Sequence, residues 1–207
     1  MTASRFTDRA RGARTAARAT AGAVLAAAAA LLPVLAGTPQ ASAATAAVTG
    51  LDNTWSCSVP AGYVYDQIVA SSSCGTTPRY HLRTPVDGLV SCVRASGFVY
   101  DTTTMSGNCS MAPGSSSASY RLRVPGDLVT SCVTASGFVH DLVTNVSQCS
   151  LAPGTTNPAY RLRTPVDGLW ACSVPRGWSS YATTLSHNCS FGSRPSDTAT
   201  MYRLKAA

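Results

Sequence analysis

The 207-residue sequence contains no glutamate and only one lysine, Lys205. Beyond its N-terminal region, no stretch combines helical apolar periodicity with capping residues, and this excludes an α-helical fold. The sequence also has no Gly-x-Ser-x-Gly motif, which excludes one common setting for a nucleophilic serine. Its three histidines, His81, His140 and His187, occupy unrelated positions, so no pair of nucleophile and base stands out.

The sequence also offers few residues for metal binding or for acid–base catalysis. None of the eight cysteines lies two to four residues from another, which is the spacing that zinc sites prefer. The only side-chain carboxylates are scattered aspartates, whereas glycoside hydrolysis needs a matched pair. We therefore expect a protein that is not an enzyme and that has no metal or cofactor.

Residues 1–43 have the organisation of an export signal. Five arginines between positions 5 and 18 precede an apolar run at 21–35, and Ala-Ser-Ala at 41–43 provides a cleavage site. The run is shorter than the roughly 20 residues of a membrane span, and Pro33 interrupts it. We expect cleavage and secretion, with no membrane span afterwards. The alanine-rich leader and the preference for arginine are typical of a high-GC bacterium.

Removal of this leader leaves 11 basic and eight acidic residues. The mature protein is therefore only weakly basic, and its charge gives no reason to expect nucleic acid as a partner. Residues 44–53 form a short lead to the rest of the chain.

The dominant feature of the sequence is a repeat. Its cysteines form four pairs, and the two members of each pair are 17 positions apart. A glycine follows each first cysteine by five residues, and a tyrosine-led segment follows each second cysteine. The pairs are Cys57 and Cys74, Cys92 and Cys109, Cys132 and Cys149, and Cys172 and Cys189. We expect one domain, residues 54–207, with units at about 54–88, 89–128, 129–168 and 169–207.

The constant spacing indicates a disulfide within each unit. An even number of cysteines in an exported chain is typical of a disulfide framework. The step between units varies, at 35, 40 and 40 residues, whereas the spacing inside each pair does not. Each bridge would contribute roughly 3 kcal/mol by closing a loop of this length. Units 2 and 3 are identical at 20 of 36 aligned positions, so both should fold and pack in the same way.

The apolar pattern predicts an all-β fold with about four short strands in each unit. The disulfide would join the first strand to the third. In Tyr-Arg-Leu-Arg, alternation places tyrosine and leucine in the core and both arginines on the opposite face. Residues 164–168 have the composition of a hairpin loop, which would join the last strand of one unit to the first strand of the next.

One strand would then be left over at each end of the array. If these two strands paired, the units would close into a small four-bladed propeller-like ring without an exposed edge. The three tryptophans, Trp55, Trp170 and Trp178, occur only in the two units that would meet there. The alternative is an open row of four stapled modules.

The candidate ligand-binding residues lie after the first cysteine of units 1 to 3. An aspartate there would accept hydrogen bonds from sugar hydroxyls, and a preceding tyrosine would offer its ring face. The candidates are Asp66 with Tyr65, Asp101 with Tyr100, and Asp141. The structural alternative, which we favour, is that these aspartates pair with arginines across the sheet and that loop aspartates cap turns.

Seven of the 11 basic residues lie in the Tyr-Arg-Leu-Arg segments and their variants. They would form either a surface for an anionic polymer or, as we favour, a solvated strand face paired with aspartates. We expect the protein to bind an extracellular glycan or cell-wall polymer multivalently. The alternative is a structural or protein-interaction module of the bacterial cell envelope, an inhibitory one included.

Overall fold

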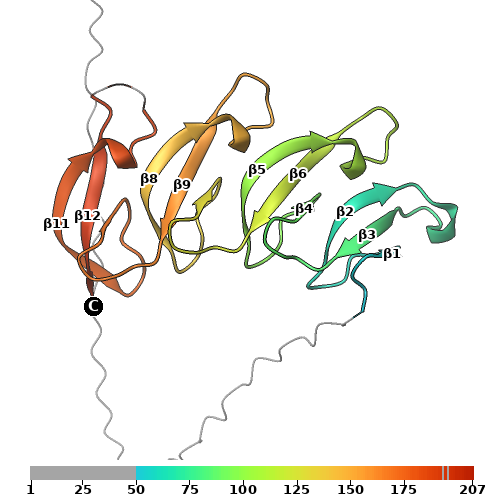
Figure 1. Cartoon of the computed structure of the whole chain (residues 1–207), viewed down its shortest axis with the longest axis horizontal. Helices are drawn as coiled ribbons and strands as arrows, with labels where there is room; N and C mark the ends of the chain where they lie inside the picture. Colours follow the sequence, from blue (N-terminus) through green and yellow to red (C-terminus); the bar gives the residue numbers. More distant parts are fainter. Residues whose placement is uncertain (1–49, 193, 195) are drawn as a thin grey trace, which may run out of the picture. The chain divides into compact units, whose positions relative to one another are not determined.

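The structure is a computed structural model that describes residues 50–192, 194 and 196–207. The export signal at 1–43 and most of the lead at 44–53 lie outside the described residues. The described part is all-β, without an α-helix, and it contains four three-stranded antiparallel sheets. Figure 1 shows the sheets one after another in chain order. We number the repeats 1 to 4 by their sheets: β1–β3, β4–β6, β7–β9 and β10–β12.

Each repeat has the same order of elements: a short first strand, a long second strand, a 3₁₀ turn and a central strand. The first strands are β1 (Thr54–Ser56), β4 (Val90–Ser91), β7 (Thr130–Ser131) and β10 (Trp170–Ala171). The second strands are β2 (Val64–Val69), β5 (Val99–Ser106), β8 (Val139–Val146) and β11 (Trp178–Ser186). The 3₁₀ turns are η1 (Ser72–Cys74), η2 (Gly107–Cys109), η3 (Ser147–Cys149) and η4 (His187–Cys189). The central strands are β3 (Arg79–Arg83), β6 (Ser117–Arg123), β9 (Asn157–Arg163) and β12 (Ala199–Ala206).

The last strand of each repeat lies between the other two. In repeat 1 the order is β1-β3-β2, and the other three sheets repeat it. This pairing corrects the prediction that the last strand forms a hairpin with the next repeat. The first strand pairs with the central strand of its own repeat, as Ser91 does with Tyr120. The supposed hairpin loop is a connection from one sheet to the next.

The predicted third strand is also wrong, because the second cysteine of each repeat ends a 3₁₀ turn. Its surroundings are short polar residues, such as Gly107 and Asn108, which do not alternate as a strand requires. The disulfide therefore links the end of the first strand to this turn. All four bridges lie within repeats, as predicted: Cys57–Cys74, Cys92–Cys109, Cys132–Cys149 and Cys172–Cys189.

The ring does not close. Strand β1 pairs with β3, and β12 pairs with both β10 and β11, so neither end leaves a strand without a partner in its own sheet. The tryptophans are consequently not gathered at a seam. Trp55 packs on His81, with ring centroids 5.1 Å apart, whereas Trp178 packs against the core residues Val139, Ala171 and Leu204. The described repeats form the open row.

The core follows the central strands. The leucine of each Tyr-Arg-Leu-Arg segment is at most 1% exposed, as predicted, and the first valine of β2, β5 and β8 is at most 3% exposed. The leucines are Leu82, Leu122, Leu162 and Leu204. The tyrosines of the same segments are only half-buried, which corrects their placement in the core. Three of them instead meet a ring of the second strand edge-on.

Neighbouring repeats are joined at a β-bulge in the second strand. In β5 the bulge lies between Tyr100 and Thr102, so the extra residue is Asp101. The carbonyl of Tyr100 accepts hydrogen bonds from the Cys132 backbone N–H, at 2.7 Å, and from the Ser131 hydroxyl, at 3.1 Å. Ser131 is fully buried. A β-bulge interrupts the hydrogen bonds between two paired strands. Here the carbonyl beside the bulge accepts hydrogen bonds from the next repeat instead.

The same joint occurs three times. Tyr65 accepts from Ser91 and Cys92 at the first joint. At the third joint the acceptor is His140, and only the Cys172 backbone N–H donates, because Ala171 replaces the serine. The 3₁₀ turn of the following repeat packs on the same second strand. Each disulfide in repeats 2 to 4 therefore connects two segments that both contact the preceding repeat.

One loop position has a left-handed backbone in all four repeats. It follows the loop aspartate, and its N–H donates to the carbonyl of the buried central leucine. The residues are Asn53 (φ 60°), Gly88 (φ 80°), Leu128 (φ 63°) and Gly168 (φ 80°). Of these four residues, Leu128 fits the left-handed conformation least well, because its Cβ crowds the backbone at positive φ.

We predict that Leu128→Gly raises the free energy of unfolding by about 1 kcal/mol, because it relieves this backbone strain. The matched control is Gly88→Leu, which should lower it by a similar amount. An added Cβ at Gly88 would meet no atom within 4 Å, so only the backbone conformation changes. Urea unfolding at equilibrium measures both. A destabilised Leu128→Gly variant would contradict the prediction.

We also predict that Cys132→Ser with Cys149→Ser costs about 2–5 kcal/mol. Because the bridge connects both segments that dock on β5, amide exchange should become faster in β5 as well as in repeat 3. Hydrogen exchange read by mass spectrometry resolves the two. The control removes Cys57 and Cys74, whose bridge contacts no preceding repeat within the described residues. Unchanged exchange in β5 would show that the bridge acts on its own repeat alone.

Candidate functional site

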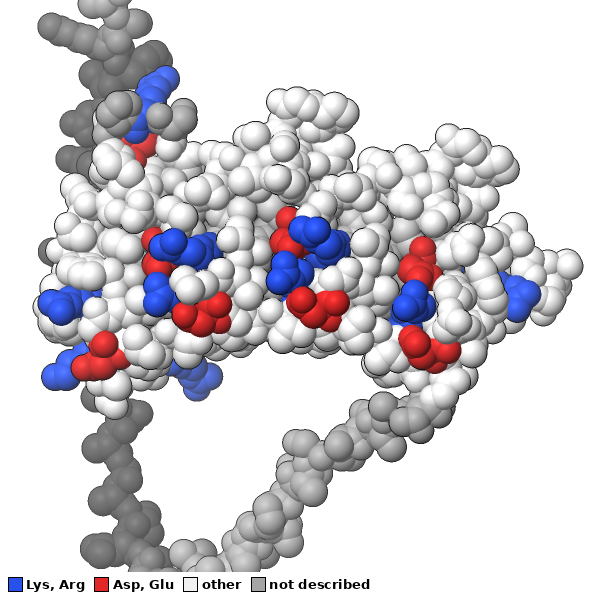
Figure 2. Space-filling view, in the orientation of Figure 1, with Lys and Arg blue, Asp and Glu red and all other residues white. Residues whose placement is uncertain are grey.

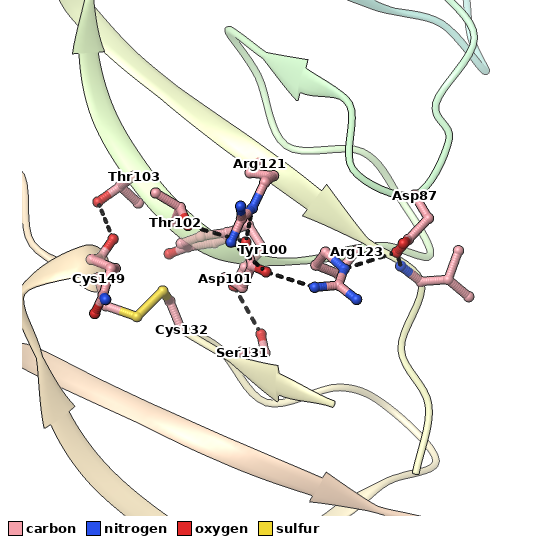
Figure 3. A network of polar contacts seen from close by, with 12 residues as sticks. Asp87, Tyr100, Asp101, Thr102, Thr103, Arg121, Arg123, Ser131, Cys132 and Cys149 are labelled. Atoms are coloured by element: carbon pink, nitrogen blue, oxygen red, sulfur yellow. Dashed lines mark hydrogen bonds and ion pairs between the residues drawn. A yellow bond between two sulfur atoms is a disulfide. The ribbon is translucent and has the colours of Figure 1, made fainter. Parts of the chain in front are cut away.

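The bulge aspartate is held by two arginines of the central strand (Figure 3). The Arg121 guanidinium donates to both carboxylate oxygens of Asp101, from Nε at 2.7 Å and from Nη2 at 3.0 Å. Arg123 donates to the second oxygen from Nη1 at 2.8 Å. The Thr102 hydroxyl adds a contact of 3.2 Å to the first. Alternation along β6 places both arginines on the face where the bulge projects Asp101.

Repeats 1 and 3 contain the same arrangement. Asp141 accepts from Arg161 at 2.7 and 3.0 Å and from Arg163 at 2.7 Å. In repeat 1 a histidine replaces the first arginine, and Asp66 binds His81 at 2.6 Å and Arg83 at 2.7 Å. Figure 2 shows blue and red side chains side by side over these three sheets. The pairing of strand aspartates with arginines, the interpretation favoured from the sequence, agrees with this geometry.

The loop aspartates complete each cluster. Asp87 accepts the Val124 backbone N–H at 2.8 Å and Arg123 Nε at 3.0 Å. The backbone hydrogen bond from Val124, followed by that from Arg123, lowers the pKa of Asp87. Asp127 has the equivalent contacts in repeat 3. These residues cap the end of the central strand, which is the turn-capping role considered for them.

The buried aspartates remain ionised. Burial raises the pKa of Asp101, but hydrogen bonds from Arg121 and Arg123 outweigh it and hold the pKa below its ordinary value. Asp141, 5% exposed, shows the same balance. A lowered pKa stabilises the fold above the unfolded-state value, and this contribution is lost as the pH falls below about 4. Both carboxylates are therefore charged near neutral pH, with their oxygens already engaged.

The tyrosines lie in a different cavity from the aspartates. Tyr100 and Tyr120 meet edge to face, with centroids 5.0 Å apart, and they line a cavity of about 460 Å³. Thr103 and Asn157 supply polar groups there, and Leu151 comes from the loop of the next repeat. Asp101 lines a separate groove of about 520 Å³, with Arg121, Arg123, Thr130 and Gln148 among its other lining residues. Neither of these two cavities is lined by both Tyr100 and Asp101.

The aromatic arrangement recurs at the other joints. Tyr65 and Tyr80 meet at 4.9 Å, and His140 and Tyr160 meet at 5.1 Å. At the third joint Phe191 of repeat 4 adds a further ring, 6.3 Å from Tyr160. Each of the three joints thus carries two half-buried rings on the earlier repeat.

Each of repeats 2 to 4 presents one exposed apolar residue to the preceding repeat. Leu151 lines the cavity of Tyr100, and Phe191 lies beside Tyr160. Met111 instead lines a cavity with loop residues of repeat 1, among them Ser72 and Pro78. The residue two positions after the second cysteine is Met111, Leu151 or Phe191, and these are 52%, 42% and 56% exposed. Repeat 1, which follows no other repeat in the described chain, has Thr76 at this position. These three residues were not among the predicted site residues. An alignment of the four repeats at this position would have revealed them.

Other kinds of site find no support in the described part of the chain. No three His, Cys, Asp or Glu side chains gather there as metal ligands would, and no helix there has the length and apolarity to cross a membrane. Comparison with protein-family models, curated proteins and solved structures finds no match for this chain. The function must therefore be argued from its own geometry.

The acceptor residue of the third joint, His140, is a titratable group. Burial lowers the pKa of its imidazole, and Asp141 opposes this in part. The unfolded chain protonates first, near pH 6.5, so the histidine should reduce stability as the pH falls below about 6.5.

We predict that His140→Tyr, which introduces the residue found in repeats 1 and 2, makes stability less dependent on pH between 7.5 and 5.5. Urea unfolding at both pH values measures the difference between variant and parent. Other titrating groups cancel in that difference. Equal losses of stability in both proteins would contradict the prediction.

Proposed function

We propose that this is an exported, non-enzymatic bacterial protein that binds an extracellular glycan through its joints. The observation that carries the proposal is the cavity between repeats 2 and 3, where the Tyr100 and Tyr120 rings adjoin neutral polar groups. Sugars present apolar C–H faces and a rim of hydroxyls, so rings beside hydroxyl and amide groups suit them. Export is supported by four disulfides, which are typical of oxidising compartments, and by the leader at 1–43.

The proposed glycan site does not include the three bulge aspartates. The sequence suggested that Asp66, Asp101 and Asp141 accept sugar hydroxyls, but arginine and histidine donors already occupy their oxygens. Of the predicted contact residues, Tyr65 and Tyr100 keep their proposed role. Thr103, Asn157 and the apolar residue of the following repeat join them.

The three joints favour multivalent binding. The three joints share the pair of rings, and a polymer that occupied two or three of them at once would gain avidity without tight contact at any one. Because the joints are built from the same elements, consecutive sites are held in a defined order along the row. A polymer with regularly repeating sugars is the ligand that such an array suits.

The exposed apolar residues also support a second candidate. Met111, Leu151 and Phe191 would suit a protein partner, with the array serving as a structural or interaction module of the cell envelope, an inhibitory one included. The two candidates differ in what the joints bind, so one set of variants tests both.

We predict that replacing Met111, Leu151 and Phe191 together with serine weakens retention on the recognised polysaccharide by roughly 100-fold, because avidity multiplies small losses. The polysaccharide is first selected on a glycan array with the mature protein. The thermal midpoint should change little, since all three side chains are exposed.

The matched control replaces Val86, Val124 and Val166 with serine. These valines are 50–52% exposed and line none of the cavities described. Their replacement should leave retention unchanged. Equal loss in both triple variants, or no glycan bound on the array, would remove the glycan proposal, and the second candidate would take its place.

A further inference from the structure

Repeat 4 departs from the charge balance of the other three. In repeats 1 to 3 the basic residues of the Tyr-Arg-Leu-Arg segment and its His81 variant are bound by aspartates. In repeat 4 the bulge residue is Tyr181, so the aspartate is missing. The central strand nevertheless keeps both cations, Arg203 and Lys205. These two residues are two positions apart on β12, so they project from the same face.

Both cations are exposed, and no described acidic side chain forms an ion pair with either. The Arg203 guanidinium instead lies over the Tyr181 ring, 5.2 Å from its centroid. The loop aspartate of this repeat, Asp167, accepts the Ala206 backbone N–H. Stacking on an aromatic face orients a guanidinium while leaving its N–H edge free for an anion.

The surrounding sequence adds further positive charge. Arg176 stands where the other repeats have Ala61, Ser96 and Ser136. Residues 167–207 contain four basic and two acidic residues, whereas the equivalent segment 127–166 contains two of each. The excess of positive charge thus coincides with the one repeat that lacks the neutralising aspartate.

We propose that Arg203 and Lys205, with Tyr181 as the support for Arg203, bind an acidic group of a polysaccharide. The guanidinium would donate a pair of hydrogen bonds to a carboxylate, phosphate or sulfate, and the ammonium would supply a second charge. This site does not depend on the aromatic joints, so it stands whether or not they bind sugar.

The small number of free cations favours isolated acidic groups over nucleic acid. A protein that binds nucleic acid neutralises many consecutive phosphates. Here the arginines of the other Tyr-Arg-Leu-Arg segments and of the His81 variant are already held by aspartates, so they form no continuous basic track over the described repeats. A polysaccharide whose acidic groups are separated by neutral sugars matches one compact site of this kind.

The experiment measures binding of the mature protein to immobilised carboxymethyl dextran, with unmodified dextran as the reference. Tyr181→Asp restores the aspartate of the other repeats and should neutralise both cations. Binding should weaken by roughly tenfold or more, and the salt dependence should fall with it. The thermal midpoint should stay equal or rise, because the variant creates the ion pairs of repeats 1 to 3. Loss of binding therefore cannot be attributed to unfolding.

The matched control is Tyr181→Phe, which keeps the ring and should bind as the parent does. Lys205→Gln should weaken binding without affecting the fold. The serine variant of Met111, Leu151 and Phe191 should still bind carboxymethyl dextran, so a failure of the joints is distinguished from a failure of this site. Unchanged binding by Tyr181→Asp would overturn the proposal. Equal affinity of the parent for a single-stranded oligonucleotide would do the same.

Discussion

One backbone carbonyl at each joint holds the array together. It belongs to the residue before the β-bulge, and it accepts the hydrogen bonds that the next repeat donates. The bulge places an extra side chain on the sheet face, and in repeats 1 to 3 this is an aspartate that needs cationic partners. Two basic residues at alternate positions of the central strand meet that need, while the leucine between them fills the core. In repeats 2 and 3 the Tyr-Arg-Leu-Arg segment therefore matches the geometry of the bulge.

The cysteine spacing was enough to predict the four repeats and their disulfides, and the apolar pattern was enough to predict the all-β class. It could not predict how the strands pair. The first strand of a repeat such as β4 has only two residues, Val90 and Ser91, and so short a segment gives no alternation from which to choose a partner. The Asp-Gly at 167–168 resembled a hairpin turn, but its glycine provides the positive φ that leads the chain into a new sheet. The ring depended on that supposed hairpin, and it fails for the same reason.

The candidate site was predictable only in part. Asp101 and Tyr100 are adjacent in sequence, and neighbours along a strand tend to project to opposite faces, so they could not be assumed to share a cavity. The structure places them on separate cavities, and each cavity is completed by the following repeat. A residue such as Leu151 contributes to a site some 50 positions from the tyrosine it adjoins. The sequence of a single repeat cannot reveal such a contact, because the contact forms only between two repeats.

Strand pairing confined to single repeats has a consequence for how the gene can change. An in-frame duplication or loss of one 40-residue segment leaves every sheet whole, since no strand pairs with a strand of another repeat. The new boundary reproduces the carbonyl acceptor and its donors, so the lengthened array keeps its joints. Repeats 2 and 3, with 20 of 36 positions identical, are what a recent event of this kind would leave behind. Recombination can thus change the number of joints one at a time, while each repeat keeps its own strand pairing.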